Sequence, residues 1–167
     1  MKEINIGKAT ELTSPNPLVL ICTKKEDGSA NLAPVSFVSY LSFNPVMVGF
    51  AMGKAAYSGE AVKKNGKAVI VVPGESLREA AISCGTCSGR DTDKAAKFGV
   101  ELVELQGSDI KIPADSKLAF AATLNKTIEI GDHFLYVCNI DKIYADESKD
   151  GLFAWNGYAK AAPAREK

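Results

Sequence analysis

The chain has 167 residues, of which 46% are hydrophobic, and its 20 Lys and Arg residues balance its 20 Asp and Glu residues. This length suits one compact domain over residues 1–167 with a sizeable core. A net charge of zero excludes a strong field toward nucleic acid, and no segment approaches the about 20 apolar residues of a membrane-spanning helix, so we expect a cytoplasmic protein without nucleic-acid or membrane partners.

The first third of the chain predicts strands. Apolar and β-branched residues at 18–23 lead to the turn pair Asp27-Gly28, which favours a hairpin. Pro34 is disfavoured inside a central strand, so we expect the strand to end or bulge there. Backbone groups of residues 35–37 would then be open to a ligand. Another buried strand is expected between Pro45 and Gly53.

Helical patterns follow at two places. Residues 55–67 mix alanine with charged residues and close at Asn65-Gly66, which is typical of a helix with a glycine cap and Ser58 in its first turn. After a strand that stops at Pro73, Ser76 and Glu79 have capping-box spacing, which predicts a helix running into Cys84. A second short helix is expected over 93–98.

The second half of the chain reads as strands with few helix signals. Residues 100–105, 117–130 and 133–145 have β-type composition, and Gly131-Asp132 joins the last two as a hairpin. A short aromatic segment at 152–158 precedes a tail that we expect to fray. The whole pattern favours a mainly β protein, a closed or half-closed barrel with two or three short helices, over a doubly wound sheet.

The four cysteines do not form a metal-site pattern. Cys22 and Cys138 lie in apolar runs typical of buried strands, so zinc is not expected and the metal assignment is none. The pair Cys84 and Cys87 has dithiol spacing, but it follows the body of a predicted helix. The helix dipole disfavours a thiolate at that end, so we interpret Cys84 as a packing or ligand-facing residue.

Two further groups of residues carry possible chemistry. Lys54, Tyr57 and Ser58 place a cation and two hydroxyls at a predicted helix start, where free N–H groups favour a phosphate. An ordinary helix start with a solvated Lys54 explains the same pattern equally well. His133 is the only histidine and follows the turn pair, and a lone histidine is more often structural or exposed.

Four segments taken together resemble the flavin reductase-like family of FMN-binding split barrels, and within it the flavoredoxins. In chain order they are NLAPVSF at 31–37, GKAAYS at 53–58, CGTCSGRDTDK at 84–94 and GDH at 131–133. The resemblance covers a core of about residues 17–158. It implies a Greek-key split β-barrel that forms a homodimer and holds FMN noncovalently near the subunit interface.

The resemblance also assigns site residues. It places Asn31, Ala33, Pro34, Val35, Ser36 and Phe37 along the isoalloxazine, and Gly53, Lys54, Tyr57 and Ser58 around the phosphate. Cys84, Ser88, Gly89, Arg90 and Lys94 would form a second wall, and His133, the catalytic candidate, would stand near the ring or the nicotinamide. Relatives commonly carry tryptophan where Phe37 stands, and Cys87 occupies a position with no family role.

The expected function is that of an FMN-binding oxidoreductase, an NAD(P)H:flavin or ferric reductase or a flavoredoxin-type electron-transfer protein. NAD(P)H is a possible co-substrate. Lys94 would stabilise negative charge on a reduced flavin and raise its potential. The alternative is a non-catalytic FMN electron carrier without nicotinamide binding, and a pyridoxamine-phosphate oxidase type is disfavoured. Apolar strands flanking Pro34 and Trp155 offer a surface for the dimer.

Overall fold

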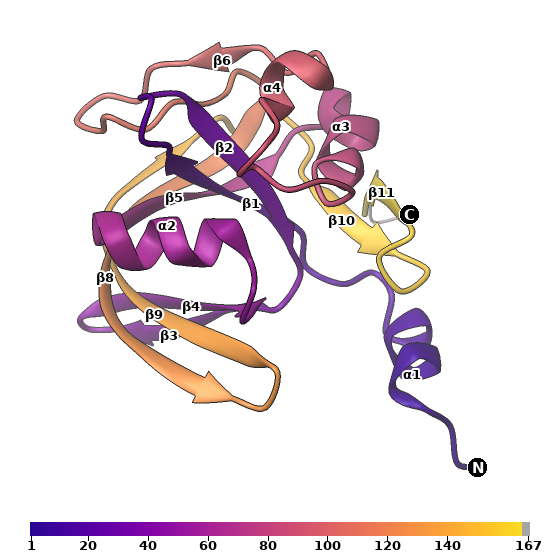
Figure 1. Ribbon diagram of the computed structural model, residues 1–167. Helices are drawn as coiled ribbons and strands as arrows, with labels where there is room; N and C mark the ends of the chain where they lie inside the picture. The colour runs from indigo at the N-terminus through magenta and orange to yellow at the C-terminus, as the bar shows by residue number, and fades with distance from the viewer. Residues whose placement is uncertain (165–167) are drawn as a thin grey trace.

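A seven-stranded antiparallel sheet dominates the computed structural model, which describes residues 1–164 (Figure 1). Its strands are β1 (Val19–Lys24), β2 (Ala30–Val35), β3 (Val38–Phe43), β4 (Val46–Gly53), β5 (Lys67–Pro73), β8 (Ser116–Ile130) and β9 (His133–Ala145). Two small ribbons pair β6 (Leu102–Val103) with β7 (Ile112–Pro113) and β10 (Leu152–Trp155) with β11 (Lys160–Pro163).

The helices are short and lie between strands or before them. They are α1 (Ile6–Leu12), α2 (Tyr57–Asn65), α3 (Arg78–Ser83), α4 (Lys94–Lys97) and the single 3-10 turn η1 (Glu75–Leu77). Across residues 1–164, no helix has the length and apolar character needed to cross a membrane.

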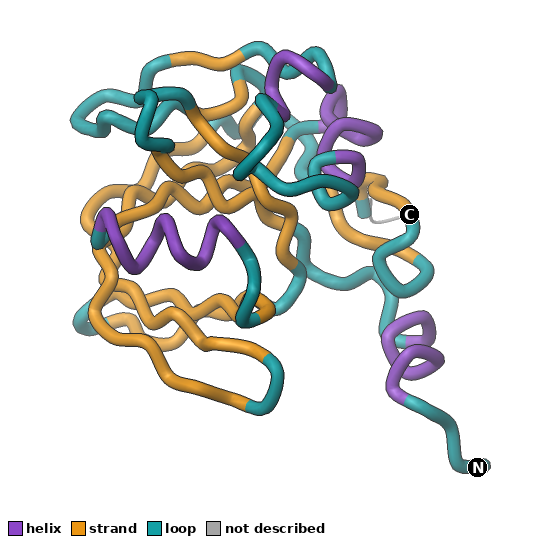
Figure 2. The backbone as a smooth tube through the Cα atoms, viewed as in Figure 1, coloured by secondary structure: helices purple, strands orange, loops and turns teal. Residues whose placement is uncertain are grey.

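The sheet curls into a barrel that stays open on one side. The strand order is β2-β1-β5-β8-β9-β4-β3, so its two edge strands are β2 and β3. These edges are consecutive in the chain and are joined only by Ser36 and Phe37. Since two residues extend a chain by at most about 7 Å, both edges must come together at this corner. The mainly β split-barrel fold predicted from the sequence is confirmed, and Figure 2 shows the strands wrapping around the opening.

Both faces of the central strands are buried, which explains their unbroken apolar sequences. Along β1, Leu20 and Cys22 pack into one cluster with α3, α4 and the C-terminal ribbon, whereas Val19 and Ile21 pack into the barrel interior. Successive side chains of a strand point to opposite faces, so a strand covered on both sides carries apolar residues at every position. Cys22 and Cys138 are fully buried in β1 and β9, as predicted.

Helix α2 packs directly on the sheet through small residues. It lies against β1, β2 and β5, and Gly59 faces the hydroxyl of Tyr136 on β9. A Cβ at position 59 would overlap that oxygen, so only glycine allows this separation. The helix closes at Gly66 in the left-handed conformation, as the sequence predicts.

Helices α2, α3 and α4 fall where the sequence places them, but the predicted capping box is wrong. Ser76 lies inside η1, where its hydroxyl and N–H donate to Asp115 Oδ2 at 2.5 and 2.9 Å. Helix α3 instead follows Leu77, which makes no side-chain cap. A carboxylate 39 residues away therefore captures the serine that local spacing assigns to a helix start.

Three other local predictions differ from the structure. Only Leu102 and Val103 of the predicted strand 100–105 are extended, because their partner β7 has just two residues. The tail does not fray throughout, since Lys160–Pro163 pairs with β10, while residues 165–167 lie outside the described part. Helix α1 has no counterpart in the sequence analysis, and it buries no residue and extends from the body (Figure 1).

We predict that Gly59→Ala destabilises the fold by about 1–3 kcal/mol, because the added methyl overpacks against the Tyr136 hydroxyl. This exceeds the gain of about 0.5–1 kcal/mol that alanine brings to a helix. In a Tyr136→Phe background, which lacks the clashing oxygen, the same substitution should cost clearly less. Urea unfolding of the four proteins measures both costs, and equal costs in the two backgrounds would contradict this packing argument.

Candidate functional site

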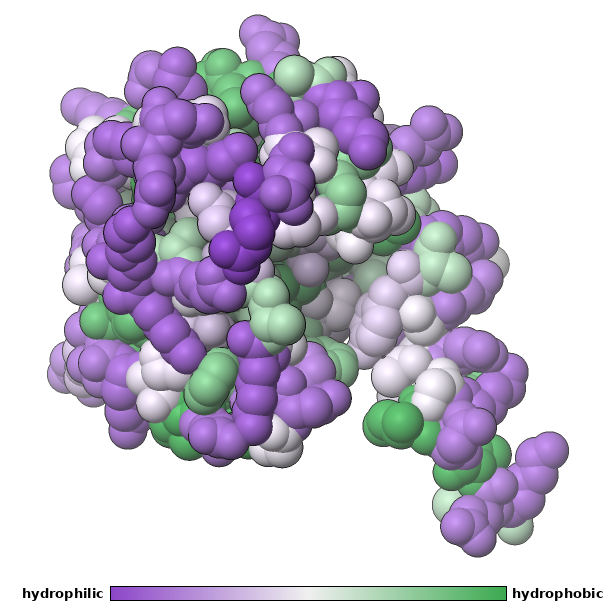
Figure 3. Space-filling model, in the orientation of Figure 1, coloured by the Kyte–Doolittle hydropathy of each residue, from purple (hydrophilic) through white to green (hydrophobic). Residues whose placement is uncertain are grey.

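The opening of the barrel contains a cavity of about 640 Å³. Its walls come from the ends of β2 and β4, the start of α2 and the loop between α3 and α4. The face shown in Figure 3 is hollowed at this place, with pale and green residues at depth and hydrophilic residues around them. No aspartate or glutamate is among the lining residues.

Most residues that the sequence analysis singled out meet in this one cavity. Those that line it are Ala33, Pro34, Val35, Ser36, Phe37, Gly53, Tyr57, Ser58, Cys84, Ser88, Gly89, Lys94 and His133. Asn31, Lys54 and Arg90 do not line it. Residues separated by up to about a hundred positions in the sequence therefore line the same cavity. The other three candidates lie outside its lining.

Asn31 is buried behind the cavity wall and positions Ser58. Its Nδ2 donates to Ser58 Oγ at 2.7 Å and to Thr23 Oγ1 at 3.2 Å. Because the serine oxygen accepts this bond, its own proton is free to donate elsewhere. Gly89 packs so closely on Asn31 Oδ1 that any Cβ there would overlap the oxygen. In residues 1–164, this Oδ1 is the one buried side-chain polar atom without a hydrogen-bond partner.

The first turn of α2 presents free N–H groups at the cavity. Its N-cap residue Ala56 makes no side-chain cap, and the first backbone bonds run from Gly59 and Glu60 to the Ala56 carbonyl at 3.0 and 3.2 Å. The backbone N–H groups of Tyr57 and Ser58 come before these residues in the chain, so no carbonyl of the helix accepts a hydrogen bond from them. Together with the Ser58 hydroxyl they form a set of donors suited to an anion.

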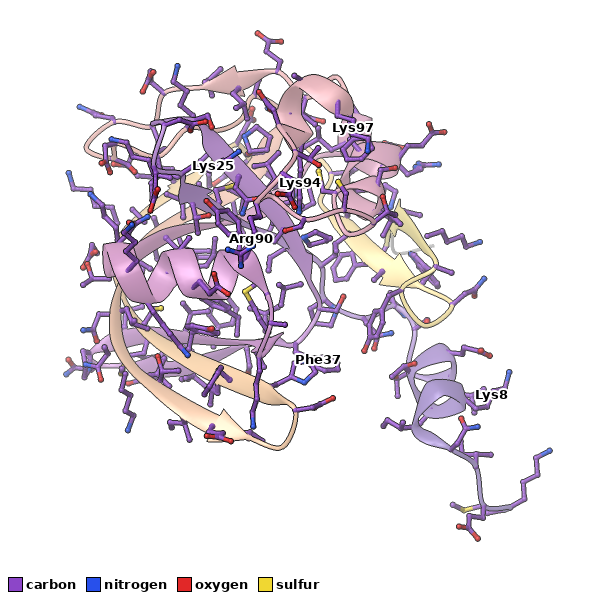
Figure 4. All side chains as sticks on the ribbon, viewed as in Figure 1. Lys8, Lys25, Phe37, Arg90, Lys94 and Lys97 are labelled. Carbon is purple, nitrogen blue, oxygen red and sulfur yellow. The ribbon has the colours of Figure 1, made fainter. Side chains whose placement is uncertain are left out.

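Arg90 lies beside this turn and neutralises a nearby carboxylate. Its guanidinium donates to Glu60 Oε2 at 2.8 Å and lies 5.2 Å from the centre of the Tyr57 ring. Figure 4 shows Arg90 over α2, close to Lys94 beside β2, while Phe37 lies farther down toward the β8–β9 hairpin. An unpaired Glu60 in the first turn would repel an anion, so the ion pair favours anion binding at this end of the cavity.

Lys54 points away from the cavity. Its side-chain ammonium pairs with Glu129 on β8, and its backbone N–H donates to the backbone carbonyl of Asp132 at 3.1 Å. Lys54 therefore ties the end of β4 to the tip of the β8–β9 hairpin.

Lys94 is a buried cation in the cavity wall. It is 4% exposed, and its Nζ donates to the carbonyls of Leu32 at 2.9 Å and Cys84 at 2.6 Å. An ammonium has three N–H donors, so one remains for a ligand. Burial lowers the pKa of Lys94. Lys94 therefore lines the cavity and has one N–H that these two carbonyls do not use.

The two cysteines of the α3–α4 loop differ in environment. Burial raises the pKa of Cys84 to about 11, with partial compensation by the charge of Lys94, so Cys84 stays a thiol at neutral pH. Cys84 ends α3, which agrees with the position inferred from the sequence, and Cys87 is partly exposed. The environment of Cys84 favours packing over redox chemistry.

Three aromatic residues from separate segments of the chain form the cavity mouth: Phe37 from the β2–β3 connection, His133 from the start of β9 and Tyr158 from the β10–β11 loop. The Phe37 ring centre is 5.5 Å from that of His133 and 6.1 Å from that of Tyr158. His133 Nδ1 lies 2.6 Å from Asp132 Oδ1, and the hydrogen bond between them, with charge attraction, lowers the pKa of Asp132. The sequence predicts a short aromatic segment here but does not predict that Tyr158 lines the cavity. Asn156-Gly157 indicates a turn, but a turn signal does not show where the next side chain points.

We predict that, in the native protein at about pH 8, one cysteine reacts rapidly with an aromatic disulfide reagent, because the reagent reaches only an accessible thiol. Cys87 is the partly exposed thiol, whereas Cys22, Cys84 and Cys138 are buried. Cys87→Ser should abolish the rapid phase, and all four thiols of the wild type should react after unfolding. A rapid phase that survives in Cys87→Ser would contradict this assignment and show that one of the three buried thiols is accessible.

Comparisons with known proteins agree with this geometry. A family model described as the flavin reductase like domain matches residues 12–162. An uncharacterized protein of Archaeoglobus fulgidus is 32% identical over 124 residues, which cover 72% of this chain and 69% of that protein.

Solved structures resemble the whole chain. A flavoredoxin from Methanosarcina acetivorans has a TM-score of 0.84 at 21% identity, covering 100% of this chain and 92% of its own. An FMN-binding protein from Thermus thermophilus, with bound 1-cyclohex-2-enone, has a TM-score of 0.82 at 17% identity, covering 100% and 96%. At these identities the structural likeness establishes the fold alone.

Proposed function

We propose that this chain, which belongs to the flavin reductase-like family, is an oxidoreductase that holds FMN in the cavity at the open side of its barrel. The observation that carries the proposal is the uncapped start of α2, which faces an otherwise largely apolar cavity with a buried lysine on another wall. The names of the similar structures, a flavoredoxin and an FMN-binding protein, support the same ligand.

The residues present fit FMN. The phosphate would be held by Ser58 and the free N–H groups of the first turn of α2, a common arrangement for anions. The cavity volume lies within the range of about 300–1,000 Å³ that small-molecule sites have. Val35 and Met52 supply apolar wall for a flat ring system, and Lys94 supplies a cation.

FMN, when bound, would supply the electron transfer itself. The contribution of the chain is to bind, orient and stabilise charge. The Lys94 ammonium, fixed by two carbonyls, would stabilise negative charge with little reorganisation, and the apolar walls would exclude water. His133 would contact the second reactant, for which we propose NAD(P)H.

We predict that Ser58→Ala weakens FMN binding about tenfold while changing riboflavin binding by less than about twofold, because only FMN carries the phosphate that accepts a charge-assisted bond. Lys54→Ala is the control, since Lys54 is paired with Glu129 outside the lining. It should change neither affinity by more than about twofold. Flavin fluorescence quenching measures all affinities.

Two results would contradict the proposal in different ways. Wild-type protein that does not quench FMN fluorescence would refute a flavin site altogether. Equal losses of FMN and riboflavin in Ser58→Ala would place the phosphate elsewhere. Steady-state oxidation of NADH and NADPH by the FMN-loaded protein then distinguishes a reductase from a pure electron carrier. A reductase would oxidise at least one of the two nucleotides, and a pure electron carrier would oxidise neither.

We further propose that the protein works as a cytoplasmic homodimer. The edge strand β3 and its neighbour expose a group of large apolar side chains, Tyr40, Leu41, Phe43 and Val46, with Phe43 92% exposed. An exposed apolar edge strand is unfavourable in water and pairs readily with another chain. The strand immediately follows the cavity corner, so a second copy seated there would lie beside the ligand.

Sedimentation velocity at micromolar concentration tests the dimer. We expect the wild type to sediment as a dimer and Phe43→Lys as a monomer, because lysine on an edge strand disfavours strand association. Because the fold of the monomer does not depend on exposed Phe43, the variant should keep its circular dichroism spectrum. A monomeric, FMN-loaded wild type would overturn the proposal.

A further inference from the structure

The loop between β10 and β11 has an unusual backbone. Asn156, Gly157 and Tyr158 adopt φ angles of 52°, 61° and 74°, so three successive residues are left-handed. Glycine tolerates this region and asparagine visits it, but for a bulky aromatic residue it is an outlier. Such conformations persist only where the surrounding structure imposes them, and they concentrate at ligand sites.

Helix α1 and the segment that follows it contact this loop. A Cβ at Gly157 would lie 3.2 Å from Thr10 Oγ1 and 3.3 Å from Glu11 Cγ, so helix α1 packs directly on the loop. Asn16 and Ala154 exchange backbone hydrogen bonds of 2.7 and 2.9 Å just before it. The loop therefore contacts α1 and the segment before β1, while Tyr158 lines the cavity.

The Tyr158 side chain occupies the cavity mouth. It lines the cavity, and its ring meets Phe37 edge to face at 6.1 Å. Phe37 in turn contacts His133, so the three rings border one entrance. Within residues 1–164, the Tyr158 hydroxyl makes no hydrogen bond, although a phenol is both donor and acceptor.

We infer that Tyr158 is a specificity-determining residue for the second reactant, which it selects as a planar conjugated molecule with a carbonyl or carboxamide oxygen. The ring offers edge or face contact to a flat π system, and the hydroxyl donates to the oxygen. The inference rests on the proposed function, because it takes the inner part of the cavity to be filled by FMN. The inference assigns Tyr158 to the binding of the second reactant, whereas the residues named under the proposed function bind the flavin.

The experiment uses the FMN-loaded full chain and benzamide, a planar carboxamide that does not exchange electrons with flavin. Benzamide is titrated while the visible absorption of bound FMN is followed, and FMN affinity is measured separately by fluorescence. We expect Tyr158→Ala to weaken benzamide binding about tenfold or more, since it loses both the ring contact and the hydrogen bond. FMN affinity should change by less than about twofold.

Two variants separate the parts of this effect. Tyr158→Phe keeps the ring and should bind benzamide at an affinity between those of the wild type and Tyr158→Ala. Phe153→Ala removes an aromatic side chain from the same hairpin that does not line the cavity, and it should bind both ligands as the wild type does.

Each remaining outcome overturns the inference. Equal losses of FMN and benzamide in Tyr158→Ala would make the residue part of the flavin wall, and unchanged benzamide affinity would leave it no role in selection. Wild-type protein that binds FMN but not benzamide refutes the inference alone. Failure of the wild type to bind FMN refutes the proposed function and the inference with it.

Discussion

The two-residue connection between β2 and β3 is the constraint on which the cavity depends. It joins the two edge strands of a seven-stranded sheet, so the sheet has to curl until its edges meet at Ser36 and Phe37. The Ala51 N–H donates to the Phe37 carbonyl at 2.8 Å and fixes this corner to β4. The ends of β2 and β4 beside this corner then supply two walls of the cavity.

The open edge of β2 needs cover, and the α3–α4 region provides it. The Lys94 ammonium donates to the carbonyls of Leu32, on the edge strand, and of Cys84, at the end of α3. One buried cation thus joins the loop to the sheet and closes the cavity on that side. Burial of a charge is costly unless its hydrogen bonds are met, which explains why two carbonyls converge on this ammonium.

Local signals in the sequence predicted most of the fold, because they act over a few residues. Asp27-Gly28, Gly66 and Gly131-Asp132 mark turns and a helix end where the structure has them. Signals that depend on distant partners were invisible. Asp115 captures Ser76, and Glu129 draws Lys54 out of the predicted phosphate site, across 39 and 75 positions. The loop that carries Tyr158 contacts α1, a segment distant in the sequence, and no local pattern predicts that Tyr158 lines the cavity.

The charges around the cavity explain how a protein with no net charge can still have a locally positive cavity. Three carboxylates near its rim, Glu60, Glu129 and Asp132, contact Arg90, Lys54 and His133 respectively. Inside, the lining carries no carboxylate, while the start of α2 and Lys94 both contribute positive potential. Charge interactions are stronger where water is excluded, so these two groups are placed to act on an anion in the cavity. A locally positive cavity therefore arises from the pairing of nearby carboxylates and does not require excess basic residues.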